Sequence, residues 1–201
     1  MFKNLSKAMC FSLVISVMLS LTLFDAKCDN IRNNVLRLHI IANSDSQFDQ
    51  DIKGKVRNRL VNENLFDSCD NYLQAIDMAQ SKVEQIKQIV KDELEGNNCS
   101  LPVKVEIGTS YFDTRVYDKT TLPAGEYNAV KIIIGEGKGR NWWCVMFPSL
   151  CLPTVSKKDK INDVVNDNTA NITQNSIKYK PAFKVIEWYE KIKSNLKKVS
   201  S

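Results

Sequence analysis

The chain has 201 residues, and its 28 lysines and arginines against 23 aspartates and glutamates give a formal net charge of +5 at pH 7. This mild, dispersed charge does not indicate a partner of nucleic-acid type. The excess of lysine lies mainly in the C-terminal part, where a solvated polar face is the simpler interpretation and attraction to anionic lipid headgroups the alternative. The length fits one domain that can bury a core without covalent or metal staples.

Residues 1–26 have the order of an export signal. Lys3 and Lys7 precede an uncharged apolar run from Ala8 to Phe24, which is the sequence of regions in a secretory signal. The run is slightly long for a signal, whose apolar region has about 7–15 residues, and short for a spanning helix of about 20. Phe24 stands where a small residue is expected before cleavage after Ala26. We expect a signal peptide over 1–26, with an uncleaved membrane anchor as the alternative.

The next part predicts one strand followed by two helices. Residues 35–42 alternate in a way that places Leu36, Leu38 and Ile40 on one face of a strand. Apolar residues at spacings of three and four predict helices over 48–61 and 72–94. The polar turn 43–46 lies between the strand and the first helix and supplies residues suited to cap it.

From residue 103 the apolar period becomes two. It predicts strands over 103–107, 111–117, 127–134 and 142–147, with turns at 108–110 and 122–125. A glycine-rich loop, 135–140, separates the last two strands, which predicts a hairpin. The expected fold class is therefore α+β: a mainly antiparallel sheet with two helices packed on one face, plus a C-terminal amphipathic helix after a flexible linker.

The C-terminal part differs in composition from the rest. Residues 154–180, polar and rich in Asn, Asp and Lys over most of their length, predict a flexible linker. Residues 181–197 predict an amphipathic helix whose large apolar side chains include Phe183, Ile186 and Trp188. The expected organisation is a signal over 1–26, an α+β domain over 31–153, the linker and the helix.

Cys144 and His39 are the residue types of a nucleophile and its base, with Asp45 or Asn43 as an orienting group. The alternative interpretation has Cys144 in a disulfide with Cys151, which is plausible outside the cytosol if the two Cα atoms approach within about 7 Å. In that case His39 is a structural hydrogen-bonding residue. The chain has one histidine and no C-x-x-C pair, so we expect no metal and no other cofactor.

The glycine loop and the tryptophans that follow it are candidates for binding. A phosphate-binding loop needs a helix after it, but the strand-like Trp142, Trp143 and Cys144 follow here. A flexible loop suited to a protein partner is the preferred interpretation. Adjacent residues of a strand point to opposite faces, so one tryptophan enters the core and the other lies at the surface. There it contacts a partner or packs under the C-terminal helix.

Two blocks of the sequence are unusual enough to identify a family. The first is LRLHIIANSDS at 36–46, followed by DQ at 49–50 and KVR at 55–57. The second joins LPAGEY at 122–127 to GEGKGRNWWCVMFP at 135–148, with Cys151 after it. Together they resemble the stage II sporulation protein R family of endospore-forming Firmicutes over about residues 31–153, with a weaker match at 183–189. Cys69, Cys99 and the asparagine-rich linker depart from that pattern.

The resemblance implies a non-enzymatic signalling protein, secreted from the forespore into the space between the forespore and mother-cell membranes. Its implied partner is a membrane-embedded aspartic-type protease of the mother cell that processes pro-sigma-E, so the implied setting is close to a membrane. The candidate contact residues are Asn43, Ser44 and Asp45 of the turn, Gly135, Glu136, Gly137, Lys138, Gly139 and Arg140 of the loop, and the exposed member of Trp142 and Trp143. An exported cysteine hydrolase using Cys144 and His39 is the second hypothesis, and a membrane-anchored structural protein of the engulfment septum is the third.

Overall fold

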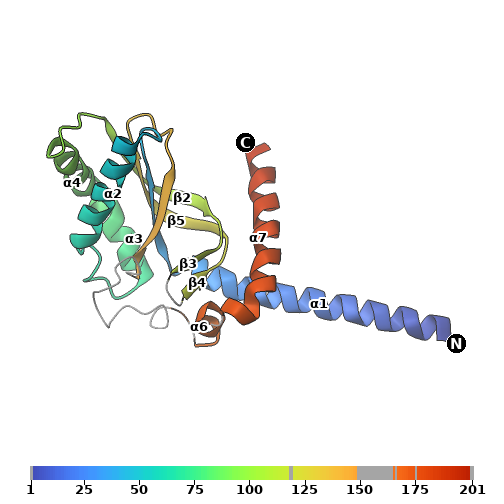
Figure 1. The fold of residues 1–201 in the computed structure, drawn as a ribbon. Coiled ribbons are helices and arrows are strands. Elements are labelled where there is room, and N and C mark those ends of the chain that lie inside the picture. Colours follow the sequence, from blue (N-terminus) through green and yellow to red (C-terminus); the bar gives the residue numbers. More distant parts are fainter. Residues whose placement is uncertain (1, 118–119, 149–164, 166, 175, 200–201) are drawn as a thin grey trace.

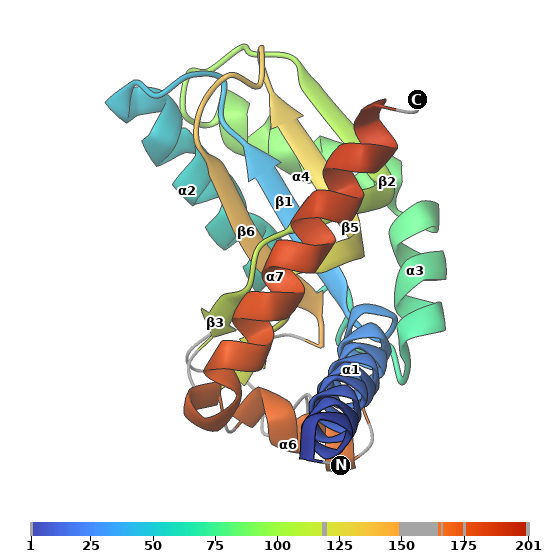
Figure 2. The same cartoon turned by 90° about the vertical axis from the view of Figure 1, so that its right-hand side faces the viewer.

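The computed structural model describes residues 2–117, 120–148, 165, 167–174 and 176–199. The fold class is α+β, as predicted, and the elements form layers (Figure 1). Helices α2 (Gln47–Asn62), α3 (Tyr72–Ser81) and α4 (Val83–Glu95) cover one face of a four-stranded sheet. The end of α1 (Phe2–Arg32) and helix α7 (Ser176–Val199) lie over the other face. Figure 2 shows α7 running across the sheet in front of β5 (Gly125–Ile134).

The main sheet has the strand order β2-β5-β1-β6, formed by Val103–Phe112, Gly125–Ile134, Leu36–Ile41 and Asn141–Phe147. Strand β1 is parallel to β5 and antiparallel to β6, and β2 is antiparallel to β5. A second, two-stranded sheet is formed by β3 (Arg115–Tyr117) and β4 (Thr120–Leu122). Antiparallel pairing therefore predominates, with one parallel pair at the centre of the main sheet.

The predicted hairpin at loop 135–140 is wrong, because β1 lies between β5 and β6. The loop crosses over the end of β1 instead of joining neighbouring strands. All residues from Leu36 to Ile40 are buried, as expected of a central strand covered on both faces. The predicted turn at 108–110 is wrong as well, since β2 continues through these residues and pairs with β5 along its whole length.

The helical layer consists of α2 (Gln47–Asn62), α3 (Tyr72–Ser81) and α4 (Val83–Glu95). The Ser46 side chain caps α2 by accepting a hydrogen bond from the Asp49 N–H group. The helix predicted over 72–94 is divided at Lys82, so three helices cover this face instead of two. No glycine or proline marks that division in the sequence. An apolar cluster that includes Leu38, Ile52 and Ile86 joins the helices to the sheet, and each such buried side chain contributes about 1.5–3 kcal/mol.

The opposite face is covered by terminal helices: α1 (Phe2–Arg32), α6 (Asp167–Gln174) and α7 (Ser176–Val199). A second apolar cluster includes Phe24, Cys28 and Ile31 of α1 together with Tyr127 of β5 and Phe183 of α7. Of the predicted linker 154–180, residues 167–174 and 176–180 are helical, while 154–164 lie outside the described residues.

Arg32, at the end of α1, contacts both α7 and the residue that precedes β5. Its Nε donates a hydrogen bond to the Ala124 carbonyl (2.9 Å), and its Nη1 lies 2.6 Å from an Asp29 oxygen and 3.7 Å from Glu190 of α7. Before Phe24, α1 extends away from the domain (Figure 1), and its large apolar side chains from Met9 to Leu19 are exposed. Among the described residues, one helix is long and apolar enough to cross a membrane, over Ser6–Arg32, by length and composition alone.

Candidate functional site

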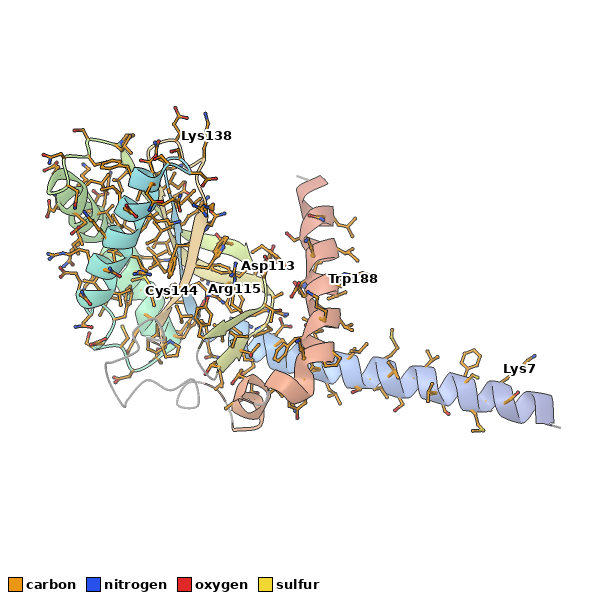
Figure 3. All side chains as sticks on the ribbon, viewed as in Figure 1. Lys7, Asp113, Arg115, Lys138, Cys144 and Trp188 are labelled. Carbon is orange, nitrogen blue, oxygen red and sulfur yellow. The ribbon has the colours of Figure 1, made fainter. Side chains whose placement is uncertain are left out.

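The two candidate segments meet at one edge of the sheet. Strands β1 and β5 are parallel, so the turn 43–46 after β1 and the loop 135–140 after β5 emerge side by side. We call this pair of segments the apical site. Figure 3 shows its Lys138 at the far end of the domain from Lys7 of α1. The sequence predicted both segments as candidates, and the fold brings them together.

Four backbone N–H groups of the loop bind the turn or the end of β1. Lys138 donates to the Asn43 carbonyl at 3.0 Å and Gly139 to the Ala42 carbonyl at 2.9 Å. Glu136 donates to the side-chain oxygen of Asn43 at 3.0 Å, and Arg140 to a carboxylate oxygen of Asp45 at 2.7 Å. The loop that was predicted as a flexible hairpin is therefore tied to the turn. Asn43 and Asp45 hold that geometry with their side-chain oxygens.

The glycines of the loop serve this close packing. Gly135 and Gly137 have φ angles of +59° and +62°, in the left-handed region that glycine adopts most readily. A Cβ at Gly139 would overlap the carbonyl oxygen of Ser44. A strand, not a helix, follows the loop, so the helix N-terminus that would hold a phosphate is missing here.

Two buried charged side chains of α2, Asp49 and Lys53, form hydrogen bonds with the two segments of the apical site. Asp49 accepts hydrogen bonds from the Ser44 hydroxyl (2.5 Å) and the Asn43 amide (2.9 Å). These bonds, that from Ser44 most of all, lower the pKa of Asp49. Lys53 donates to the Arg140 carbonyl at 2.8 Å, and its burial lowers the pKa of its ammonium group.

Asp49 and Lys53 were missed as site residues by the sequence analysis. A signal for them was present, because both fall on the buried stripe of α2, which consists of Asp49, Ile52, Lys53, Val56 and Leu60. A charged residue at an apolar position of a helix needs a buried partner. That requirement points to the loop that passes over the helix.

The exposed surface of the apical site is charged. Lys138 and Glu136 form an ion pair at 2.7 Å, and Arg140 Nε lies 3.5 Å from Asp45. All four side chains are well exposed. Phe48, in the first turn of α2, adds an exposed aromatic ring at the same end of the helix. This combination is suited to binding a protein surface of mixed charge.

The two tryptophans of β6 point to opposite faces, as predicted. Trp143 packs inward, stacked on His39 with ring centroids 3.7 Å apart, and meets the Phe112 ring edge-on at 4.8 Å. Trp142 is 38% exposed and lies under the guanidinium of Arg57 of α2, 4.4 Å from its ring centroid. The surface member is therefore Trp142, which is covered in part by α2 and not by the C-terminal helix.

The proposed Cys144–His39 pair is not assembled. Cys144 is opposite Leu38 in the β1–β6 register and belongs to the apolar cluster under α2–α4. His39 points to the other face, where its Nε2 lies 2.9 Å from the Asn141 side-chain oxygen. Since neighbouring strand residues alternate in direction, these two side chains cannot form a nucleophile–base pair, and Asp45 is engaged at the apical site.

Other predicted chemistry is left open by the described residues. Cys151 lies outside them, so its disulfide with Cys144 stays a prediction. Among the described residues, no group of three or more His, Cys, Asp and Glu side chains is placed to hold a metal ion.

The comparisons with known proteins agree with the sequence blocks named above. The model of the stage II sporulation protein R family matches residues 32–157. The stage II sporulation protein R of Bacillus subtilis (strain 168) is 34% identical over 135 residues, which are 66% of this chain and 60% of that protein. The match thus spans about three fifths of the relative's length. No solved structure matches the chain.

Proposed function

Because this chain belongs to the stage II sporulation protein R family, we propose that it is a non-enzymatic sporulation signal that activates the membrane-embedded protease processing pro-sigma-E. The forespore exports the protein, and the aspartic-type protease of the mother-cell membrane receives it. One observation carries the proposal. The two sequence blocks that carry the family resemblance, 93 residues apart at Asn43 and Glu136, meet in one hydrogen-bonded, exposed surface.

A ligand activates its receptor only by binding the active state better than the inactive one. The apical site supports such selective binding because its loop is already fixed by the turn, which reduces the ordering cost of association. Lys138, Arg140 and Glu136 provide exposed charges of both signs. Residues 43, 45 and 135–140 therefore act as a unit, in which Asn43 and Asp45 position the loop and the charged side chains meet the receptor.

Helix α1 supports the export part of the proposal. Its apolar segment crosses or enters the membrane, and its last turns belong to the folded domain. Cleavage after Ala26 would remove Phe24, which packs on Phe183 of α7 with centroids 5.2 Å apart, and Asp25, which pairs with Arg32 at 3.2 Å. These contacts favour the anchored alternative over a cleaved signal. Either form presents the domain in the intermembrane space.

The test is co-expression of the full chain with the protease and pro-sigma-E in a non-sporulating host, followed by a blot for cleaved sigma-E. The wild-type chain should produce cleavage. The double variant Lys138→Ala/Arg140→Ala should reduce it at least about tenfold, which corresponds to about 1.4 kcal/mol of binding free energy. The loop should stay folded, because the Arg140 hydrogen bonds that hold it use backbone atoms.

A matched control is Arg59→Ala/Lys87→Ala, which also removes two cations that are paired with carboxylates on the domain surface. Pro-sigma-E cleavage in the presence of this control variant should equal that with the wild-type chain. Normal pro-sigma-E cleavage in the presence of the Lys138→Ala/Arg140→Ala variant would exclude the loop as the contact surface. No cleavage with the wild-type chain, although all three proteins are present, would refute the proposed function.

A further inference from the structure

Helix α7 has two apolar stripes, and among the described residues only one of them is packed on the domain. The inner stripe, with Phe183 and Ile186, is buried against the domain. The outer stripe consists of Val185, Trp188, Tyr189, Ile192 and Leu196, which are exposed by 47%, 74%, 52%, 57% and 66%. Their spacings of three and four place them along one side of the helix. A surface helix needs a single apolar stripe to hold it on its core, so the outer one is available for another contact.

Lysines border the outer stripe. At 100° per residue, Lys184 and Lys191 fall on one flank and Lys193 on the other, and all three are exposed. Lys184 is paired with Glu187 and Lys193 with Glu190 on their own helix. An apolar stripe that contains Trp and Tyr and is bordered by lysines is typical of helices that lie in the plane of a membrane interface. Anionic lipid headgroups are therefore the chemistry that fits both parts of the surface.

The position of α1 shows where a membrane would lie. The Phe24 ring packs on Tyr179 and Phe183 near the start of α7, with centroids 6.0 and 5.2 Å apart. Large apolar side chains of α1 from Met9 to Leu19, and that of Leu23, are exposed, for example Phe11 at 73% and Leu23 at 66%. When α1 spans a bilayer, the lipid surface therefore lies close to Phe24, beside the beginning of α7.

The orientation of α7 agrees with this position. In Figure 1, α7 runs across the direction in which α1 leaves the domain. In Figure 3, Trp188 lies on the side of α7 toward which α1 extends. In Figure 2, where α1 points toward the viewer, α7 lies in front of the sheet. A membrane crossed by α1 therefore faces the outer stripe of α7 along its length.

We propose that α7 is a membrane-interface helix, whose outer stripe inserts into the headgroup region of the bilayer that α1 spans while its lysines contact anionic lipid phosphates. This second contact fixes the orientation of the domain on that membrane. The layer of α2–α4, on the opposite side of the sheet from α7, then points away from the lipid. The proposal does not depend on the identity of the receptor.

The test uses tryptophan fluorescence of the full chain in vesicles of brominated phosphatidylcholine mixed with phosphatidylglycerol. The chain has three tryptophans, Trp142, Trp143 and Trp188, and bromine quenches a ring that lies within the lipid. Wild-type fluorescence should be quenched relative to vesicles without bromine. Trp188→Phe should remove more than half of this quenching, and the control Trp142→Phe should leave it unchanged.

Quenching that is equal in the wild type and in Trp188→Phe would overturn the proposal. A second variant, Trp188→Glu/Ile192→Glu, separates lipid contact from a protein interface. This variant should have the same oligomeric mass as the wild type in detergent. A wild-type dimer that this variant converts to a monomer would assign the outer stripe to a second copy of the chain and overturn the membrane contact.

Discussion

The two faces of β1 bury different chemistry. Leu36, Leu38 and Ile40 point to the face under α2–α4, where the cluster is apolar. Arg37 and His39 point to the other face and lie among aromatic rings beneath the terminal helices. The helices of the first face lie within residues 32–157, which match the family, whereas almost all of α1, and α6 and α7, lie outside that range. The family segment thus completes one face alone and depends on the chain's termini for the other.

Arg37 is the centre of the second face and is fully buried. Its guanidinium lies 4.2 Å from the Phe112 ring centroid and 4.9 Å from that of Tyr127. It donates hydrogen bonds to the Cys144 carbonyl (3.0 Å) and the Tyr117 hydroxyl (2.7 Å). No carboxylate of the described residues forms an ion pair with it, and burial lowers its pKa. Aromatic rings supply the stabilisation that a carboxylate gives in most buried sites.

The largest expected effect comes from testing whether Arg37 acts as a core residue. Arg37→Ala should lower the free energy of unfolding by about 2–5 kcal/mol, because it leaves a cavity among the rings. Arg37→Met should stay within about 1.5 kcal/mol of the wild type, since it fills the space without a buried charge. Urea unfolding of the detergent-solubilised chain measures both.

Leu38→Ala provides the reference for Arg37→Ala, because it also truncates a fully buried side chain to alanine, on the other face of β1. Its effect should be of the same size as that of Arg37→Ala. A loss below about 0.5 kcal/mol for Arg37→Ala is typical of surface sites. Such a result would show that the terminal helices do not form a core with the sheet.

The next largest effect concerns loop 135–140, which packs on the turn 43–46. Gly139→Ala should lower the free energy of unfolding by about 1–3 kcal/mol, because its Cβ meets the Ser44 backbone carbonyl and one of the two segments must move. Thermal unfolding measures the change, and pro-sigma-E cleavage should fall with it.

Gly54→Ala is the matched control in α2, where a Cβ meets nothing within 4 Å. It should raise the free energy of unfolding by about 0.5–1 kcal/mol, because alanine favours a helix over glycine. Equal free energies of unfolding for the two alanine variants would show that the close contact between the loop and the turn does not contribute to stability.

Local pattern predicted the parts of this molecule that depend on neighbouring residues. The alternation in β1 assigned its side chains to faces, and the adjacent tryptophans of β6 were correctly placed on opposite sides. Loop 135–140 was misread because β1, the strand inserted between β5 and β6, ends 84 residues before β5 begins and leaves no local signal. The burial of Arg37 could not be predicted from local pattern either, because the aromatic rings that pack on it come from distant segments such as β2 and β5.

The smallest expected effect is a pH dependence confined to the second face. Burial, aided by the charge of Lys131, lowers the pKa of His39, although the hydrogen bond with Asn141 opposes this. In the unfolded chain, His39 therefore binds a proton near pH 6.5, the ordinary pKa of histidine. In the folded chain, His39 remains neutral at that pH. Unfolding is therefore favoured as the pH falls.

Between pH 7.5 and 5.5 the free energy of unfolding should decrease, by at most about 1.4 kcal/mol for each unit by which the pKa is lowered. His39 is the chain's one histidine, so His39→Gln, which does not titrate, should flatten the curve across this range. Urea unfolding at a series of pH values measures the slope. An unchanged slope in His39→Gln would place the titrating group elsewhere, and the second face would then bury its polar residues without any dependence on pH.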